Sequence, residues 1–573
     1  DQVGSITASG DLNLKAGQNV ELQGSVTAAD GNTSITAGNK IDISSIATGD
    51  RVAVVGTDRD KRINVNNNSA LVGGKNVQLQ AGGDLALTGS HVTATDSITA
   101  EAGGSIELKA VKDRKMEDAE IGHRGGFYYN RVMTDDEKVQ GSSMSAGGDI
   151  SLQSGRDINI ISSNIASEQG KITADAAGSV NLNTMTEHHE SIFEEHKKKI
   201  GFLSSKTTDI YDAKAADYNV GSNISGDSVD LTSGKDTNIT ASNVFADNDV
   251  NITAGGNVNI IAVEDTSSST YKKQVKKSGL LSGGGLGFTI GKEKRKDQYD
   301  NQNVEQAGST VGSIKGSVNV EAGKDVSISA SDVLAGKDIN LTGQNVTIES
   351  ADNTYNAQEK HEYKKSGLTV SLTTPALSVA ESVHDTIKKA DSVKDDRLKA
   401  LIVGKEVNDL TKSGKDSVLN QTKDGLKDGF NADDFSLNIS IGSQKSKTES
   451  SSITTVAQGS TVKADGNVNI TATEKDINIK GSDISGEDVS LAAKGDVNIT
   501  SAKNTNTSSS DSKASSGSIG VSINTSGISD INAGYSKYKG EVKENGTTHT
   551  NSTVTANDKL TVESGKDTNI SGS

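Results

Sequence analysis

The residues best suited to metal chemistry in this sequence are histidines set among carboxylates. Segment 187–196 (EHHESIFEEH) holds three of the eight histidines together with four glutamates. Imidazole and carboxylate groups are ordinary Zn²⁺ ligands, but a zinc site also needs a fixed geometry and supporting outer groups. Three lysines follow directly at 197–199, and the chain contains no cysteine. We therefore expect a charged, solvated hairpin here, with no metal site and no cofactor.

Glycine-rich turns are the next candidates for chemistry. The run at 283–287 (GGGLG) could suggest a phosphate-binding loop, but such a loop continues into Lys-Ser or Lys-Thr and a helix. Here the run is followed by Phe288-Thr-Ile-Gly, which is a strand pattern. The Gly-Gly turns at 146–149 and 254–257 lack the nine-residue repetition of calcium-binding rolls. We expect structural turns at all three places.

Aspartates recur at Asp157, Asp236, Asp325 and Asp338, and they raise the possibility of glycan cleavage. Solenoid enzymes that cleave polysaccharides gather Asp, Arg and Lys on one outer face. Each aspartate here instead ends a Gly-Arg-Asp or Gly-Lys-Asp turn, where its side chain is expected to hydrogen-bond the local backbone. The sequence therefore predicts no catalytic residues, and we expect that the chain is not an enzyme.

Basic residues gather in one segment of an acidic chain. The net charge is −17, which argues against nucleic acid as a partner because its phosphates repel an acidic surface. Segment 271–296 nevertheless sets eight basic residues against Glu293, namely Lys272, Lys273, Lys276, Lys277, Lys292, Lys294, Arg295 and Lys296. Two interpretations stay open: the charges maintain solubility, or they attract anionic lipopolysaccharide or phospholipid.

These candidate residues are carried by a repeating pattern of short strands. Apolar β-branched residues recur at Ile150, Ile158, Ile165, Ile172 and Val180, so the pattern closes after 22 residues. Apolar and polar residues alternate within each unit, which is the period of a strand with one buried face. Glycine-containing turns separate the units. Three short strands per coil describe a solenoid, whose coils bury their apolar side chains only by stacking.

The spacing recurs in separated blocks of the chain. Steps of 21 residues lead from Val229 to Val250, from Val318 to Ile339 and from Val468 to Val489. Hydrophobic residues make up 32% of the chain and aromatic residues 3%, which suits a narrow interior. Disorder is the alternative for so polar a chain, but periodic apolar residues argue against it. We predict an all-β solenoid with about 21 residues per coil, running through 1–573 as a single rod segment.

Five insertions are expected to interrupt this rod, near 111–145, 185–218, 264–308, 351–457 and 503–551. Each is predicted to be a β-hairpin extruded from the rod. Their alternating apolar residues are Leu286, Phe288 and Ile290, then Leu368, Val370 and Leu372, then Phe435, Leu437, Ile439 and Ile441, and finally Ile519, Val521 and Ile523. Pro375 and the helical spacing of the apolar residues after it predict a helical part over 375–411.

The alternating strands of the insertions allow two expectations. In the first, their apolar faces pack against the solenoid and shield it in the secreted form. In the second, the hairpins leave the rod and enter the envelope of a target cell. Strands that cross an outer membrane alternate over about 9–11 residues, and segment 435–441 approaches that length. The basic and apolar residues named above are therefore candidate membrane or partner contacts.

The sequence resembles a known family. Its rungs are similar to the haemagglutinin repeats of large two-partner-secreted exoproteins. The similar segments are 145–165 (SAGGDISLQSGRDINIISSNI), 232–260 (TSGKDTNITASNVFADNDVNITAGGNVNI), 456–473 and 549–572. The Lys-Lys-Ser-Gly-Leu sequences at 276–280 and 364–368 resemble the second repeat region of contact-dependent growth inhibition proteins. Filamentous haemagglutinins contain related sequences. The resemblance covers essentially the whole chain.

The resemblance implies a right-handed parallel β-helix, secreted and displayed on a Gram-negative surface after export through an outer-membrane two-partner-secretion transporter. In growth-inhibition members, this region is associated with the target cell's outer membrane and with delivery of a C-terminal toxin. The family's secretion, pretoxin and toxin regions have no counterpart in these 573 residues.

We therefore expect a non-catalytic stalk and translocation segment that contacts the outer membrane or a surface receptor of a target cell. The alternative is the rod of a filamentous haemagglutinin, an adhesin that mediates cell attachment. Neither interpretation gives nucleic acid as a partner of this segment.

Overall fold

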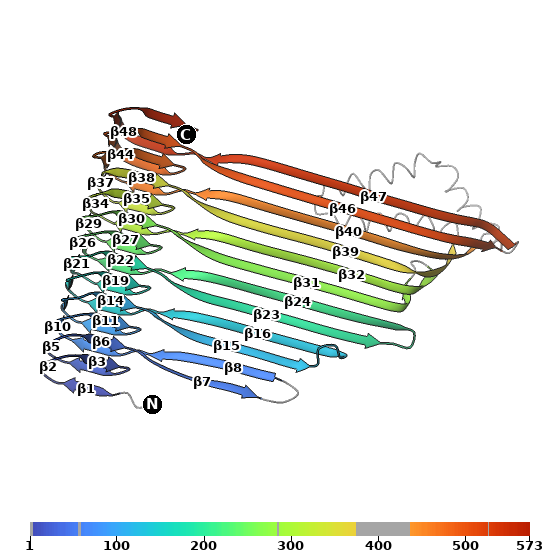
Figure 1. The fold of residues 1–573 in the computed structure, drawn as a ribbon, viewed down its shortest axis with the longest axis horizontal. Helices are drawn as coiled ribbons and strands as arrows, with labels where there is room; N and C mark the ends of the chain where they lie inside the picture. The colour runs from blue at the N-terminus through green and yellow to red at the C-terminus, as the bar shows by residue number, and fades with distance from the viewer. Residues whose placement is uncertain (1–3, 55–58, 283–285, 374–435, 525–526, 573) are drawn as a thin grey trace, which may run out of the picture.

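The computed structural model describes residues 4–54, 59–282, 286–373, 436–524 and 527–572. Regular structure in these ranges is β-strand, and they contain no helix, hence none that is long and apolar enough to cross a membrane. The predicted helical part 375–411 and Phe435 lie outside the described residues. The strands form two parts (Figure 1). One is a column of stacked coils, the rod, and the other is a 12-stranded sheet that extends from its side, the wing sheet.

Each coil of the rod supplies strands to three columns. One column is a 13-stranded sheet of β3 (Val20–Gln23), β6 (Ile41–Ser44), β11 (Leu85–Thr88), β14 (Ile106–Lys109), β19 (Ile158–Ile161), β22 (Val180–Asn183), β27 (Thr237–Thr240), β30 (Val258–Ile261), β35 (Asp325–Ser329), β38 (Asn345–Glu349), β43 (Ile477–Lys480), β45 (Val497–Thr500) and β49 (Thr568–Ser571). The other two columns join into a 24-stranded sheet. They join through β44 (Asp483–Ala493) and β48 (Thr553–Ser564), which run through both columns.

The remaining strands of the 24-stranded sheet divide between its two columns. The first holds β1 (Ser5–Ala8), β4 (Val26–Ala29), β9 (Leu71–Gly74), β12 (His91–Ala94), β17 (Ser143–Ala146), β20 (Asn164–Ser167), β25 (Asn223–Gly226), β28 (Asn243–Ala246), β33 (Thr310–Ser313), β36 (Asp332–Ala335) and β41 (Thr461–Ala464). The second holds β2 (Leu12–Ala16), β5 (Thr33–Ala37), β10 (Val77–Ala81), β13 (Ile98–Ala102), β18 (Ile150–Ser154), β21 (Lys171–Ala176), β26 (Ser228–Ser233), β29 (Val250–Ala254), β34 (Val318–Ala322), β37 (Ile339–Gly343) and β42 (Val468–Ala472).

Strands of successive coils pair in parallel. In the register, Val229 lies opposite Val250, Val318 opposite Ile339, and Val468 opposite Val489. The side chains that alternate inward are completely buried, as at Leu152, Ile158 and Ile160. One continuous apolar cluster runs from Leu22 to Ile499, so each coil depends on its neighbours for a core. The all-β prediction is confirmed, and the parallel coils agree with a β-helix.

Polar ladders on the outside of the rod fix the register of the coils. The side-chain amide of Asn181 donates to Asn159 at 2.9 Å, Asn238 donates to Asn181 at 2.8 Å, and Asn259 donates to Asn238 at 2.8 Å. Because each amide is both donor and acceptor, the ladder can be continued from one coil to the next. A shift of one residue would break these bonds and turn every apolar side chain outward.

The recurring aspartates act between coils, which corrects the expectation that they bond the local backbone. The Oδ1 atom of Asp157 accepts the backbone N–H of Ser179 at 2.8 Å, and that of Asp236 accepts from Asn257 at 2.7 Å. Asp338 likewise accepts from Asn467 at 2.7 Å, whereas Asp325 lies 3.5 Å from Lys475 Nζ. Stacking places the next coil's N–H directly over the turn, so the carboxylate ties two coils together.

A hairpin leaves the rod after every second coil, always at the same corner. Hairpins follow β6, β14, β22, β30, β38 and β45. After β3, β11, β19, β27, β35 and β43 the chain instead turns tightly, with a left-handed residue at Gly24, Gly89, Ser162, Ala241, Ala330 and Gly481 (φ between 41° and 57°). The corner therefore alternates between a one-residue turn and an extruded hairpin.

This alternation explains why the hairpins join into one sheet. Two stacked coils rise by about 9.6 Å, and the two strands of a hairpin occupy the same width at about 4.8 Å per strand. Each hairpin therefore meets the next at pairing distance: β16 pairs with β23, β24 with β31, β32 with β39 and β40 with β46, all antiparallel.

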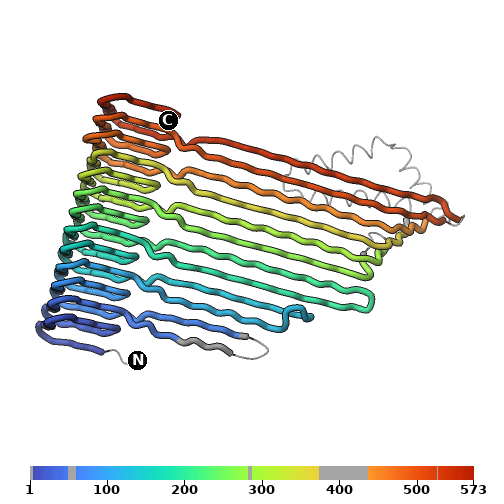
Figure 2. Tube along the Cα trace, viewed as in Figure 1, coloured from blue at the N-terminus to red at the C-terminus, as the bar shows by residue number. Residues whose placement is uncertain are grey.

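The wing sheet is a continuous antiparallel meander. Its strands are β7 (Ile46–Val54), β8 (Arg59–Asn68), β15 (Val111–Gly122), β16 (Tyr128–Gln140), β23 (Met185–Ile200), β24 (Ser204–Val220), β31 (Val263–Ser282), β32 (Leu286–Ala307), β39 (Ala351–Thr373), β40 (Ser436–Gln458), β46 (Ala502–Asn524) and β47 (Gly527–Thr550). They lengthen from 9 residues in β7 to 24 in β47. Figure 2 shows the resulting broad outline, widest near the C-terminal end.

A column of buried serines lines the corner where the wing sheet leaves the rod. Ser222, Ser242 and Ser309 are almost fully buried. The N–H of Ser222 donates to Ser242 Oγ at 3.0 Å, and that of Ser242 donates to Ser309 Oγ at 3.1 Å. The serine hydroxyls thus satisfy buried backbone groups that the change of chain direction leaves without strand partners.

Two expectations are wrong. The five predicted insertions leave residues 46–68 to the rungs of the rod, but β7 and β8 form a sixth hairpin. Alternation of period two is common to rungs and hairpins, so it does not separate them. The second is one of the two alternatives for the hairpins, in which their apolar faces pack against the solenoid. Instead the wing sheet extends away from the rod (Figure 1), and its strands pair with one another.

Candidate membrane-contact surface

The register of the wing sheet gathers the apolar residues at its free end onto one face. Residues directly opposite each other in an antiparallel pair share a face, as do residues two apart along a strand. Three rows follow from the pairing. The first is Leu280, Ile290, Leu368, Ile441 and Ile519, the second is Phe288, Val370, Ile439, Val521 and Ile531, and the third is Leu372, Leu437, Ile523 and Ile528. We call these the apolar rows.

The apolar rows are open to solvent. The exposed fraction is 42% at Phe288, 53% at Ile290, and 63% at both Ile441 and Ile519. Val370, Leu372, Ile439, Val521 and Ile523 are half-buried by their neighbours. A contiguous exposed apolar surface of this kind is typical of a contact site.

The apolar rows include three residues that are not among the predicted contact residues. Of the predicted contact residues, Leu286 is placed only by the pairing of its backbone. Leu280, Ile528 and Ile531 are exposed by 43%, 68% and 69% and continue the rows onto β31 and β47. Leu286 begins β32 opposite Leu372. Phe435 lies outside the described residues.

The basic residues divide between the two faces. Five of them lie on the same face as the apolar rows, namely Lys272, Lys276, Lys292, Lys294 and Lys296. The other three, Lys273, Lys277 and Arg295, lie on the opposite face. On that opposite face, Lys277 and Arg295 have acidic partners. Lys277 Nζ lies 2.9 Å from Glu293, and Arg295 Nε lies 3.0 Å from Asp297.

On the apolar face, four lysines stand directly opposite one another across four strands. They are Lys276, Lys294, Lys364 and Lys445, and we call them the lysine row. Between this row and the nearest apolar row lie Ser278, Lys292, Ser366 and Ser443. The small serines leave a hollow of about 470 Å³ that the lysine row borders.

The motif Lys-Lys-Ser-Gly-Leu is the sequence signal for this arrangement. Alternation turns its first lysine, its serine and its leucine to one face, and its second lysine and its glycine to the other. The two copies, at 276–280 in β31 and 364–368 in β39, flank β32 and hold the same register against it. At Gly367 an added Cβ would lie 2.5 Å from the carbonyl oxygen of Ile290, so the close strand approach requires glycine there.

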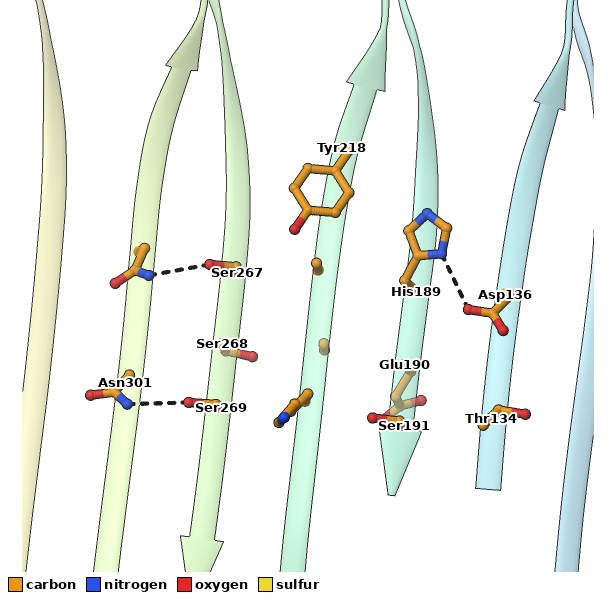
Figure 3. Close-up of a pocket in the computed structure, with 14 residues that line it drawn as sticks. Thr134, Asp136, His189, Glu190, Ser191, Tyr218, Ser267, Ser268, Ser269 and Asn301 are labelled. Carbon is orange, nitrogen blue, oxygen red and sulfur yellow. Dashed lines mark hydrogen bonds and ion pairs between the residues drawn. The ribbon is translucent and has the colours of Figure 1, made fainter. Parts of the chain in front are cut away.

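Another hollow of the wing sheet carries no comparable chemistry. It lies on the opposite face nearer the rod, with a volume of about 380 Å³, and Figure 3 shows His189, Tyr218 and Asp136 around it. Its polar groups bond to each other, as Asn303 does to Ser267 at 3.3 Å and His189 to Asp136 at 3.2 Å. Small alanine and serine side chains form it, and none of the candidate contact residues lines it.

The histidine-rich segment of β23 pairs across strands. The Nδ1 atoms of His188 and His196 lie 2.6 Å from Asp217 and 2.5 Å from Asp209. The hydrogen bond to Asp217 raises the pKa of His188. Within the described part of the chain, no group of three or more His, Cys, Asp or Glu side chains is arranged to hold a metal ion.

Comparison with known proteins places the chain as follows. The hemagglutinin-repeat family matches residues 54–122, 128–279, 276–367 and 440–573. The chain is 35% identical over 445 residues to the 16S rRNA endonuclease CdiA of Enterobacter cloacae subsp. cloacae, which covers 76% of this chain and 13% of that protein. It is 33% identical over 607 residues to the tRNA nuclease CdiA of Escherichia coli (strain STEC_O31), covering 100% of this chain and 17% of that protein.

A third relative, the deoxyribonuclease CdiA of Dickeya dadantii (strain 3937), is 31% identical over 582 residues. That match covers 100% of this chain and 17% of the relative. The chain therefore spans 13–17% of the length of these three proteins. No solved structure matches the chain.

Proposed function

This chain belongs to the hemagglutinin-repeat family, and we propose that it is a non-catalytic stalk segment that brings the wing sheet to the outer membrane of a target cell and helps deliver a toxin. The family match confirms the resemblance drawn from the repeats. Proteins of this family are secreted, surface-exposed exoproteins of Gram-negative bacteria, and their two-partner secretion implies an outer-membrane transporter as the export partner.

The names of the relatives support delivery. They specify three different targets, 16S rRNA, tRNA and DNA. The three proteins nevertheless share similarity to this chain over most of its length. A region common to proteins with different nucleic-acid targets suits a function that they share, such as display or delivery. Because these relatives are named as nucleases, delivery is favoured over the adhesin alternative.

The observation that carries the proposal is the collection of the apolar rows on one face from separate hairpins. Ile290, Ile441 and Ile519 come from three hairpins, yet they lie in one row with more than half of each side chain exposed. Removing apolar area from water yields about 25 cal/mol per Å². A membrane that covered the free end of the wing sheet would gain this energy from the ends of all three hairpins, β31–β32, β39–β40 and β46–β47, together.

The tips of the shorter hairpins also expose aromatic side chains. Phe202 is 100% exposed between β23 and β24, and Phe127 is 64% exposed next to β16. Lys198 Nζ lies 5.7 Å from the Phe127 ring centroid. Aromatic rings with lysine beside them are typical of protein surfaces at a membrane interface.

The proposal is tested with the full chain and outer-membrane vesicles. We expect vesicles to protect segments 264–308 and 436–458 from protease and to carry the chain upward in a flotation gradient. The variant Phe288→Ser/Ile441→Ser/Ile519→Ser is expected to lose most of this binding. Unchanged cleavage in the presence of vesicles would refute membrane contact.

A matched control separates the contact from general hydrophobicity. Ile453 lies on the same strand and face as Ile441, 48% exposed but near the rod, so Ile453→Ser should bind vesicles as the parent does. Ile441→Ser alone should weaken binding. Equal effects of the two single substitutions would show that the free end of the wing sheet has no special role.

A further inference from the structure

The lysine row is an unfavourable arrangement for the isolated chain. Lys276, Lys294, Lys364 and Lys445 lie directly opposite one another on adjacent strands, which are about 4.8 Å apart. Like charges placed opposite each other in an antiparallel sheet are destabilising. Lys276, Lys364 and Lys445 are exposed and Lys294 is half-buried, so the four positive charges are presented together at the surface.

Acidic partners occur all around this row but not within it. No side chain of Asp or Glu in the described ranges forms an ion pair with any of its four lysines. On the same face, Glu449 lies closer to the rod and pairs with two lysines. Its carboxylate is 2.6 Å from Lys447, which is one row toward the rod, and 2.9 Å from Lys360, which is two rows toward the rod. On the opposite face, Lys277 lies 2.9 Å from Glu293. The lysines that adjoin the apolar end thus lack the counter-charges that these three lysines have.

The hollow beside the row supplies hydrogen-bond donors. Ser278, Ser366 and Ser443 line it together with the four lysines. Ammonium and hydroxyl groups donate to the same kind of ligand, one with several acceptor oxygens and negative charge. The hollow runs across strands rather than closing around a point, so it accommodates several such groups side by side.

The distances match a membrane surface. Ser366 and Lys364 precede Leu368 by two and four residues along β39, which is about 7 and 13 Å. The polar headgroup region on each side of a bilayer is about 5–8 Å thick, and a lysine stem can extend its ammonium group over the remaining distance. With the apolar rows at the hydrocarbon boundary, the serines would lie among headgroups and the lysines would reach their phosphates.

We propose that the lysine row and the adjoining serines bind the phosphate groups of anionic membrane lipids. This rests on the proposed membrane contact and adds its ligand class. The phosphates neutralise a charge row that the chain itself leaves uncompensated. They also set the depth and tilt of the wing sheet, because the row runs parallel to the edge of the apolar surface.

The test compares two faces with the same loss of charge. Lys276→Gln/Lys364→Gln removes one charge from β31 and one from β39 on the apolar face. Lys273→Gln/Lys365→Gln removes one from each of the same strands on the opposite face. Binding of the full chain is measured on vesicles of phosphatidylcholine alone and of phosphatidylcholine mixed with phosphatidylglycerol, at low and high salt.

We expect the parent to prefer the anionic vesicles, and the lysine-row variant to bind them about tenfold more weakly. The control variant should keep at least most of that preference, and neutral vesicles should bind both variants like the parent. High salt should remove the difference. Equal losses in both variants would overturn the proposal. Absence of binding to either vesicle by the parent would instead refute the proposed membrane contact.

Two further measurements guard the interpretation. Since the row is repulsive, Lys276→Gln/Lys364→Gln should protect β31 and β39 from hydrogen exchange at least as well as the parent, which excludes misfolding. Titration with soluble tripolyphosphate separates the sources of phosphate. Row-dependent binding of tripolyphosphate without preference for anionic vesicles would assign the row to a soluble phosphate ligand and contradict the lipid assignment.

Discussion

The rod and the wing sheet are built from the same alternating strands but bury them differently. In the rod, three columns face inward and Ile158 and Ile160 have no exposed surface. The wing sheet is a single layer, and Ile441 and Ile519 are each 63% exposed. Burial of apolar side chains therefore stabilises the rod, whereas main-chain hydrogen bonds between strands stabilise the wing sheet. The rod sets the spacing between successive hairpins of the wing sheet.

The contrast also separates the structural and the functional parts of the sequence. Residues of the rod are chosen by coil geometry: small β-branched side chains inside, asparagine and aspartate between coils. Residues at the free end of the wing sheet satisfy no such need. Their apolar rows and lysine row cost stability in water, which is why we assign the contact with a target membrane to them.

The largest expected difference between the two regions is in the response to loss of an isoleucine side chain. Ile160→Ala in the rod should lower the free energy of unfolding by about 2–5 kcal/mol, because it opens a cavity in a closed core. Ile441→Ala in the wing sheet should change it by less than about 0.5 kcal/mol. Urea unfolding followed by circular dichroism measures both. Similar losses would show that the wing sheet has a core of its own.

A smaller effect is expected at the corner between the two regions. Ser309 Oγ lies 2.9 and 2.8 Å from the carbonyl oxygens of Ile239 and Ile261. Ser309→Ala should therefore destabilise the chain by about 1–3 kcal/mol, the cost of leaving buried polar groups unpaired. Ser518→Ala, at an exposed site of the wing sheet, is the control and should be within about 0.5 kcal/mol of the parent. Comparable urea midpoints for both variants would show that the buried serine column does not stabilise the corner between the rod and the wing sheet.

The smallest expected effect is a difference in pH response with opposite sign. In the rod, burial lowers the pKa of His91. In the wing sheet, partial burial lowers the pKa of His361, but hydrogen bonds to Asp297 and Glu359 outweigh it and raise that pKa. A raised histidine pKa contributes stability that is complete below about pH 6.5 and is lost as pH rises through the folded value. A lowered one withdraws stability as pH falls below about 6.5.

Hydrogen exchange corrected for its intrinsic pH dependence measures this contrast. On going from about pH 8 to about pH 6, we expect slower exchange where β32 pairs with β39 and slightly faster exchange around β12. The shifts should be small because the His361 side chain is 36% exposed and solvent screens its partners. Shifts of the same sign in both places would contradict the assignment of the two environments.

The sequence predicts the rod well because its information is local. Ile150, Ile158 and Ile172 recur at fixed steps, and glycine turns mark the corners, so strands and coils follow from period and spacing. The sixth hairpin at β7–β8 could not be separated from rungs, since Val52, Ile63 and Val65 alternate as rung residues do.

The candidate surface could be predicted only in part because it depends on register between distant segments. The residue types at Phe288, Leu368 and Ile519 were apparent from alternation. Lys364 and Lys445 are not among the predicted contact residues, because nothing in the sequence indicates that Lys364 lies opposite both Lys294 and Lys445. The division of the basic cluster between two faces, with Lys277 paired to Glu293, also follows from strand register and not from composition.

The central claim, that two coils per hairpin template the wing sheet, is tested most directly by two deletions. Removing 229–249 deletes one coil and leaves the β23–β24 and β31–β32 hairpins on successive coils, about 4.8 Å apart where two strands need about 9.6 Å. Removing 223–309 deletes two coils together with one hairpin, and so keeps the spacing, with β24 facing β39.

Hydrogen exchange of these two deletion variants gives the measurement. We predict that the one-coil deletion keeps a protected rod but loses protection where β24 and β31 pair, because the wing sheet must split there. The two-coil deletion should keep both the rod and a continuous wing sheet. Full protection of β24 and β31 in the one-coil deletion would contradict the account.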